Sequence, residues 1–561
     1  MHRALPRAAA QGVAARVRPP SANEGLVHLA TVALVCAGLG LATYGSRSLM
    51  RLRPWEPGEG VPIVRLFARG AEVQVASAAE PAGPVDPEGA DVAAPEPPLD
   101  PVLLAAATGA GAIEPPPTLA TPEEPSATER TPLIAASEVA GLPLEMEDRD
   151  DAMDAFYRSL ERTARGEAVI TRVAHFGDST IAFDGITQTV RERMQRRFGD
   201  AGSGFVLATR GTMSYGHHHV RTDSEGEWRV MEATHHGLSD GRYGIGGAQA
   251  RADAGASAWF ETPERSVVGG TVSRFEVMYQ RFERGGRFDY RVDDAAWVPV
   301  ETRLGSASAS ASASASASAS ESASASASES ESESESESES ESASASLEDA
   351  LLTVQVPAGA HRLTIRTMGH GETRIYGVVL ENGDRGVVYD SLGMVGARAQ
   401  RMLGFDPSHF RQQLAQRDVA LVVIAFGGND ADDDREESEF EYTFRRVARF
   451  VRQARPEASC LLMAPLDQAE RDERGTITTL PTIPRIVDAM RSAARHEGCA
   501  FFDTWTAMGG DGSMGRWFRQ EPRLGGGDFR HATPAGYRVI GEMLYRALLM
   551  GFRRWERARH E

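Results

Sequence analysis

Short apolar runs alternate with segments of helical periodicity over much of the chain beyond residue 147. The first run, AVITRVAHF, is followed by GDST and a helical stretch. The later runs are GVVYDSLG, DVALVVIAFGG, ASCLLMAPLD and CAFFDTW. Helices are expected over 151–165, 183–198, 440–453, 484–496 and 534–550, with another from Ala397. Strand, turn and helix in regular succession predict five strands in a doubly wound, mostly parallel sheet.

Between residues 241 and 374 this rhythm breaks, because apolar and polar residues alternate there with a period of two and turn signals separate the runs. We therefore expect a β-sandwich at 241–374, inserted between the first two strands of an α/β domain made of 147–240 and 375–552. Residues 306–346, nearly pure Ser-Ala and Ser-Glu dipeptides, interrupt the insertion. Without large apolar side chains, this repeat is expected to be a solvated loop.

One long apolar segment lies near the N-terminus. Residues 26–45 (LVHLATVALVCAGLGLATYG) carry no formal charge and are long enough to span a bilayer as a helix. We expect an uncleaved membrane anchor with residues 1–25 as a cytoplasmic tail, although a signal peptide or a buried helix would give the same pattern. A lipoprotein site at Cys36 is disfavoured, because Val35 is bulky where a small residue is expected.

Residues 46–146 are rich in Pro, Ala, Glu and Gly and poor in aromatic residues. Such a composition predicts a disordered linker. The expected arrangement is thus a membrane-anchored protein whose folded part lies outside the cytoplasm, in the periplasm or at the cell surface.

Charge and cysteine content exclude some classes of protein. The formal net charge of -19 argues against a nucleic-acid binder, which needs a basic surface. Three cysteines are too few for a disulfide scaffold or a Cys-rich metal site. Cys460 and Cys499 each open an apolar run. We favour two buried thiols there, with a disulfide between neighbouring strands as the alternative.

Ser179 stands in Gly-Asp-Ser, where the first strand ends and a helix begins. This position places its hydroxyl at the edge where open α/β sheets bind ligands. The helix N-terminus would stabilise developing negative charge there. Taken alone, the tripeptide is more typical of a plain helix cap than of a nucleophile.

Asp528 and His531 form an Asp-x-x-His pair. Thr533 can cap the final helix and Pro534 suits its first turn, so His531 is expected on a loop directly before that helix. The spacing allows the carboxylate to accept the imidazole Nδ1–H and leaves Nε2 free as a base toward a serine. A surface histidine with an incidental aspartate is the plain alternative.

Asn429, in Gly-Gly-Asn-Asp, directly follows the apolar run LVVIAF. Its amide could donate to an oxyanion at the end of that strand. An ordinary Asn-Asp turn is the alternative and would have the same sequence. Gly396 follows another strand and opens another helix, and its backbone N–H could be a second donor. The plain reading of Gly396 is a turn glycine.

These motifs occur in one order, each where a strand or loop meets a helix, and together they resemble the SGNH (GDSL-like) hydrolases. The resemblance covers about 147–240 and 375–552 and implies a flavodoxin-like three-layer fold. It also implies the role of each motif. Ser179 would be the nucleophile of a triad with His531 and Asp528; the oxyanion hole would be formed by Ser179, Gly396 and Asn429.

One departure concerns the second oxyanion donor. Relatives of this type often carry Asn before the glycine of that block, where this chain has Val395. The choice between Gly396 and Gly393 therefore stays open.

A narrower likeness is to peptidoglycan O-acetylesterases, in which a β-sandwich resembling a carbohydrate-binding module is inserted at the same place. The implied function is a serine esterase that removes O-acetyl groups from a cell-envelope polysaccharide such as peptidoglycan. An O-acetyltransferase using the same triad and a non-catalytic cell-wall-binding protein are the alternatives.

No metal or organic cofactor is implied by these motifs. His217, His218 and His219 adjoin in sequence, but no carboxylate at ligand spacing accompanies them, and we interpret them as a polar loop. The expected partners are an O-acetylated polysaccharide or another small acyl ester, and the membrane through the single N-terminal helix. We expect a monomeric catalytic domain.

Overall fold

The computed structural model describes residues 145–210, 215–235, 237–263, 268–305, 313–314 and 347–560, together with Leu103, Leu133 and Ile134. The predicted anchor (26–45), its N-terminal tail (1–25), most of the linker (46–146) and all but 313–314 of the Ser/Ala/Glu repeat (306–346) lie outside these residues. No helix within the described ranges is both long and apolar enough to cross a bilayer.

Five parallel strands form the central sheet, as the apolar runs predict. They are β1 (Ile170–Gly177), β12 (Gly386–Gly393), β13 (Leu421–Ala425), β14 (Ser459–Met463) and β17 (Ala500–Phe502), in the order β12-β1-β13-β14-β17. This is the flavodoxin-like order, with a switch point at β1. Leu421 and Val423 of β13 enter one hydrophobic cluster, and Val422 and Ile424 enter another. Both faces are thus covered, which explains the unbroken apolar runs.

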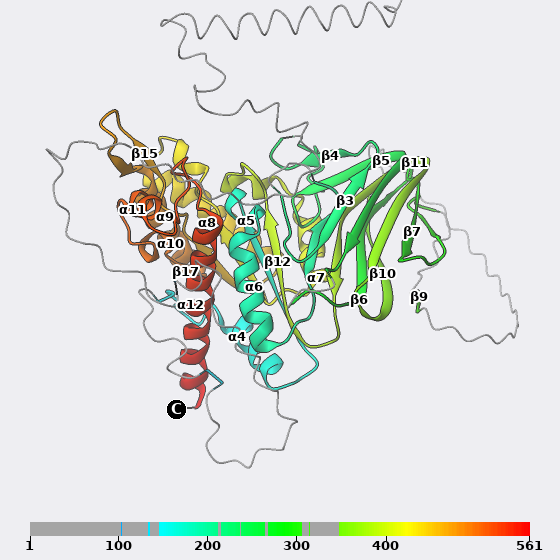
Figure 1. The fold of residues 1–561 in the computed structure, drawn as a ribbon, viewed down its shortest axis with the longest axis horizontal. Helices are drawn as coiled ribbons and strands as arrows, with labels where there is room; N and C mark the ends of the chain where they lie inside the picture. Colours follow the sequence, from blue (N-terminus) through cyan, green and yellow to red (C-terminus); the bar gives the residue numbers. More distant parts are fainter. Residues whose placement is uncertain are drawn as a thin grey trace, which may run out of the picture. The chain divides into compact units, whose positions relative to one another are not determined.

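Two groups of helices cover these faces (Figure 1). One group is α4 (Asp154–Ala164), α6 (Gly185–Phe198) and α12 (Pro534–His560). The other is α7 (Pro407–Arg417), α8 (Glu437–Ala454) and α9 (Thr482–Glu497). Short elements complete the domain: α5 (Ser179–Ala182), α10 (Thr504–Ala507), α11 (Ser513–Arg519), η3 (Ala399–Gly404), η4 (Asp430–Asp432), and a hairpin of β15 (Ala469–Arg471) and β16 (Ile477–Thr479).

Two helix predictions need correction. The helix expected from Ala397 is divided into η3 and α7, because Asp406 caps a new helix whose first residue is Pro407. The last helix continues ten residues past Met550. The helix passes through Gly551, where α12 packs closely on α4. The glycine is needed for this close approach, because a Cβ at residue 551 would clash with the Tyr157 hydroxyl.

The insertion is all-β, as the period-two pattern predicts. Its strands are β2 (Gly204–Leu207), β3 (Arg221–Glu225), β4 (Arg229–Glu232), β5 (Ala248–Glu261), β6 (Val272–Phe282), β7 (Arg287–Val292), β8 (Val298–Glu301), β9 (Ala313–Ser314), β10 (Leu347–Gly359) and β11 (Arg362–Glu381). Pairing joins them into one sheet, antiparallel except at β9, around its own apolar cluster. The expected sandwich architecture stays a prediction.

This sheet extends beyond the predicted limits of 241 and 374. Strands β2, β3 and β4 precede residue 241, and β11 continues to Glu381. The early strands escaped the sequence pattern because β2 has four residues, while β3 (RTDSE) and β4 (RVME) are short and carry several charges.

Two further expectations, the free thiols and a linker that is disordered throughout, are wrong. Cys460 of β14 and Cys499, the residue before β17, form a disulfide, so the preference for free thiols is wrong. The parallel pairing of β14 with β17 brings the two side chains together on one face. Within the predicted linker, Ile134 is buried and the Leu133 N–H donates to Glu556 of α12, so this part is packed on the domain.

Candidate active site

Ser179 lies where β1 ends and α5 begins. Asp178 caps this short helix: its carboxylate accepts hydrogen bonds from the Thr180 backbone N–H at 2.9 Å and from the Thr180 hydroxyl at 2.8 Å. Ser179 is therefore the first residue of α5 and is only 8% exposed. This is the position that the Gly-Asp-Ser motif predicts.

The structure brings the three residues of the expected triad together. Ser179 Oγ lies 2.9 Å from His531 Nε2, and His531 Nδ1 lies 2.7 Å from Asp528 Oδ2. Partial burial alone would raise the pKa of Asp528, but hydrogen bonds from the His531 side chain and backbone lower it. The carboxylate is thus ionised at neutral pH, holds Nδ1 protonated and leaves Nε2 facing the hydroxyl.

The loop that carries Asp528 and His531 is closed by one backbone hydrogen bond and held against β15 by another. The Gly526 N–H donates to the His531 carbonyl at 2.7 Å, and the Ala469 N–H of β15 donates to the Phe529 carbonyl at 2.9 Å. After the loop, Thr533 caps α12 by accepting the Gly536 N–H at 3.1 Å, as the sequence predicts.

Asn429 and Gly396 lie on neighbouring loops. The Asn429 amide donates to the Ala397 carbonyl at 3.2 Å, which joins the loop after β13 to the loop after β12. Gly396 has a left-handed φ of +74° and open space around its Cα. Gly393 is enclosed instead, because a Cβ there would lie 2.1 Å from the Ala182 N of α5. Of the two glycines, Gly396 is the one with room for a ligand.

Two buried carboxyl groups escaped the sequence analysis. Burial is the main cause that raises the pKa of Asp178, and it raises that of Asp430 to about 6, helped by the nearby Asp178 and Asp433. Asp430 Oδ2 accepts the Ala399 N–H at 3.2 Å, while its buried Oδ1 has no hydrogen-bond partner among the described residues. Their places inside Gly-Asp-Ser and Gly-Asn-Asp were visible in sequence, but their burial was not.

Arg530, also unpredicted, connects three loops at the rim of the site. Its Nη1 donates to Asp432 Oδ1 and to Gln468 Oε1, both at 2.9 Å, and its backbone N–H donates to Asp528 Oδ1 at 3.0 Å. It lies between the two residues of the Asp-x-x-His motif, but no sequence spacing identifies its partners.

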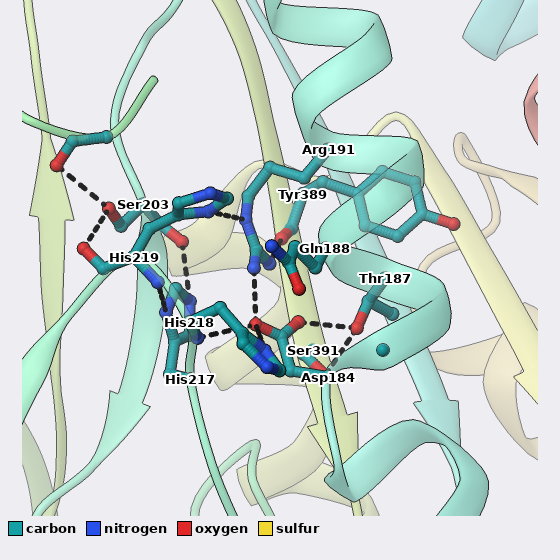
Figure 2. Close-up of polar contacts among 12 residues, drawn as sticks. Asp184, Thr187, Gln188, Arg191, Ser203, His217, His218, His219, Tyr389 and Ser391 are labelled. Atoms are coloured by element: carbon teal, nitrogen blue, oxygen red, sulfur yellow. Dashed lines mark hydrogen bonds and ion pairs between the residues drawn. The ribbon is translucent and has the colours of Figure 1, made fainter. Parts of the chain in front are cut away.

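The three adjacent histidines lie in a loop, as expected, but His217 and His219 are buried, and the loop lies beside Arg191 of α6 (Figure 2). Burial, followed by the charge of Arg191, lowers the pKa of His217 to about 3. His219 Nδ1 accepts from Arg191 Nε at 3.1 Å, so its Nε2 carries the proton donated to Glu192 at 3.0 Å. Among the described residues, no group of three His, Cys, Asp or Glu side chains is arranged to hold a metal ion.

The chain was compared with known proteins. Residues 366–539 match the GDSL-like Lipase/Acylhydrolase family. This segment contains Asn429, Asp528 and His531 but not Ser179, which the inserted sheet separates from them. No curated protein matches the chain.

Among solved structures, a peptidoglycan O-acetylesterase is similar over 73% of this chain and 99% of its own, with a TM-score of 0.55 and 20% identity. A family two carbohydrate esterase from Cellvibrio japonicus covers 60% of this chain and 99% of its own at 12% identity, and the acetyl xylan esterase AlAXEase covers 29% and 81% at 15%. The TM-scores of the last two are 0.22 and 0.23, so only the first likeness supports the fold. The resemblance drawn from the sequence motifs is thereby confirmed.

Proposed function

We propose that this chain belongs to the SGNH (GDSL-like) hydrolases and is a serine esterase that removes O-acetyl groups from a cell-envelope polysaccharide such as peptidoglycan. The observation that carries the proposal is the chain of contacts from Ser179 Oγ to His531 at 2.9 Å and from His531 to Asp528 at 2.7 Å. A hydroxyl, an imidazole and an ionised carboxylate in this order form the constellation of acyl transfer through a serine.

In the proposed mechanism, His531 Nε2 takes the Ser179 proton as Oγ attacks the acetyl carbonyl carbon. The carbonyl π electrons move to oxygen, and the resulting oxyanion accepts hydrogen bonds from the Ser179 N–H, the Gly396 N–H and the Asn429 amide. The Asn429 amide has two N–H groups, so one can keep its bond to the Ala397 carbonyl while the other turns to the oxyanion.

Collapse of the tetrahedral intermediate breaks the bond to the sugar oxygen, which takes the proton from His531 and leaves. A water molecule then attacks the acetyl-Ser179 ester, with His531 as base, and acetate is released. Asp528 stays ionised through both steps and stabilises the imidazolium.

The sugar substrate is supported by the layout of the chain. The inserted sheet, which we infer to be a carbohydrate-binding β-sandwich, follows the Ser179 segment in sequence. The solved peptidoglycan O-acetylesterase is similar in fold over 73% of this chain. The uncharged segment 26–45 would anchor the enzyme, with its monomeric catalytic domain outside the cytoplasm, close to such a polymer.

The test is acetate release from O-acetylated peptidoglycan and, in parallel, from O-acetylated xylan. We expect the wild type to release acetate from peptidoglycan and Ser179→Ala to release it only at the background rate. Release by both proteins at the same rate would rule out the serine mechanism. Release from xylan alone would rule out peptidoglycan as the substrate.

A further inference from the structure

Phe183 is a large apolar side chain that the mechanism leaves unused. It is 38% exposed, and it directly follows α5, the helix that begins at Ser179. The other exposed large apolar side chains of the described residues lie on the inserted sheet or on α8; they are Val298, Leu351, Met368 and Tyr442. Phe183 is thus the member of this group that borders the site.

Its ring lies against the catalytic base. The ring centroids of Phe183 and His531 are 6.1 Å apart, and their planes are nearly perpendicular at 88°. The Phe183 ring also contacts Tyr537 of α12, and the centroids of these two rings are 6.3 Å apart. The remaining surface of the phenyl ring is open to solvent beside the imidazole.

The backbone at Phe183 is held by buried contacts. Asp184, the next residue, has a left-handed φ of 59° and is fully buried. Its carboxylate accepts from the Thr187 hydroxyl at 2.6 Å, from Arg191 Nη2 at 2.5 Å and from the His218 N–H at 2.9 Å (Figure 2). This network fixes the turn between α5 and α6, so the exposed aromatic ring is presented on a rigid support.

The reaction determines what meets this ring. His531 Nε2 returns its proton to the leaving oxygen, so the leaving group must lie within hydrogen-bond distance of Nε2, and Phe183 borders the same imidazole. In the proposed mechanism the acetyl oxygen is bound instead by Ser179, Gly396 and Asn429. A pyranose ring carries a face of C–H groups that packs on an aromatic ring, and ligand sites commonly use aromatic walls of this kind.

We propose that Phe183 is a specificity-determining residue on which the ring of the leaving sugar stacks. This inference rests on the proposed function, because it assumes that the leaving group is a sugar alkoxide. It identifies the substrate as an acetylated pyranose rather than an acetylated alkyl alcohol.

The experiment compares two acetate esters that share the acyl group and differ in the leaving group: methyl 6-O-acetyl-glucopyranoside and ethyl acetate. Acetate release is measured for the wild type, Phe183→Ala and Phe183→Trp. We expect Phe183→Ala to lose about tenfold more kcat/KM on the pyranoside than on ethyl acetate, chiefly through KM, and Phe183→Trp to restore the ratio. Tyr442→Ala, which removes an exposed ring on α8, should keep the wild-type ratio.

An equal loss on both esters would overturn the proposal, because Phe183 would then only support His531. A wild-type kcat/KM of Phe183→Ala on both esters would overturn it as well. If the wild type hydrolyses neither ester, the proposed function fails separately. Calorimetric titration of the pyranoside into Ser179→Ala, with and without Phe183→Ala, then still tests the stacking: weaker binding without the ring supports it, and equal binding refutes it.

Discussion

At the scale of single residues, the site consists of side chains that each have a fixed hydrogen-bond partner. His531 is held between Ser179 and Asp528, and Asn429 is held by the Ala397 carbonyl. The Ser179–His531 and Asn429–Ala397 contacts each join two different loops, whereas His531 and Asp528 share one loop. Substitutions here should change catalysis more than stability.

The Asn429 amide is expected to act mainly in the transition state. Asn429→Ala should lower kcat by about 10²–10³ and change KM little, since the oxyanion exists only during acyl transfer. Steady-state kinetics with ethyl acetate measure both constants. A fall in kcat of less than threefold would exclude Asn429 from the oxyanion hole.

Asp430 should make stability depend on pH. Its pKa is raised by burial to about 6, above its usual value of 3.8, so the folded state binds more protons than the unfolded state between these two values. Stability therefore falls as pH rises through this range, and the loss is nearly complete at about one pH unit above the folded pKa. Asp430→Asn should remove this loss, which is on the order of 3 kcal/mol at pH 7.5 and almost nothing at pH 3.5.

Thermal unfolding at both pH values provides the measurement for Asp430. Asp434→Asn is the matched control, because the side chain of Asp434 is 98% exposed and its substitution should change neither value. Equal effects of Asp430→Asn at pH 3.5 and 7.5 would contradict the assignment.

At the scale of elements, the turn between α5 and α6 depends on one buried ion pair. Asp184 and Arg191 are both fully buried. Burial would raise the pKa of Asp184, but Arg191 and the neighbouring histidines lower it well below its usual range. The stability that this carboxylate contributes is present at neutral pH and is lost as pH falls through its unfolded value toward the lower folded pKa.

Asp184→Asn should destabilise the protein by about 3–5 kcal/mol, because Arg191 is left buried without a countercharge. Glu457→Gln removes an exposed partner of Arg455 and should cost less than about 1 kcal/mol. Denaturant unfolding of both variants at pH 7 gives the comparison. Similar costs for the two would show that the Asp184 network is unimportant for the fold.

The elements that the sequence predicted are those whose pattern is local. The five apolar runs identified all central strands, and the Gly-Asp-Ser, Gly-Gly-Asn-Asp and Asp-x-x-His motifs located the loops of the site. Strands β3 and β4 were missed because their sequences are short and polar. They form strands because they pair with β5, and this pairing leaves no pattern in their own sequence. The Cys460–Cys499 bond and the Asp184 network likewise depend on contacts between distant segments.

At the scale of the whole molecule, buried ion pairs join the inserted sheet to the α/β domain. Glu381, the last residue of β11, accepts from Arg172 of β1 at 2.9 Å and from Arg417 of α7 at 2.7 Å. Arg417 also contacts Asp390 of β12 through two nitrogens at 3.1 Å. These bonds tie the end of the insertion to the sheet that carries Ser179.

Glu381→Gln should therefore destabilise both parts together, by about 3–5 kcal/mol, because two buried or nearly buried guanidinium groups lose a partner. Glu348→Gln, on an exposed pair within the insertion, is the control. Denaturant unfolding followed by far-UV circular dichroism should show one transition at lower denaturant for Glu381→Gln. A wild-type midpoint for this variant would mean that the junction does not depend on these pairs.

The most direct test of the account is labelling of the purified protein with a fluorophosphonate, followed by peptide mapping. The hydrogen bond from Ser179 Oγ to His531 predicts one modified residue, Ser179, with labelling abolished in Ser179→Ala and strongly slowed in His531→Ala. Absence of label on wild-type Ser179, or equal labelling of the His531→Ala variant, would contradict an activated serine at this site.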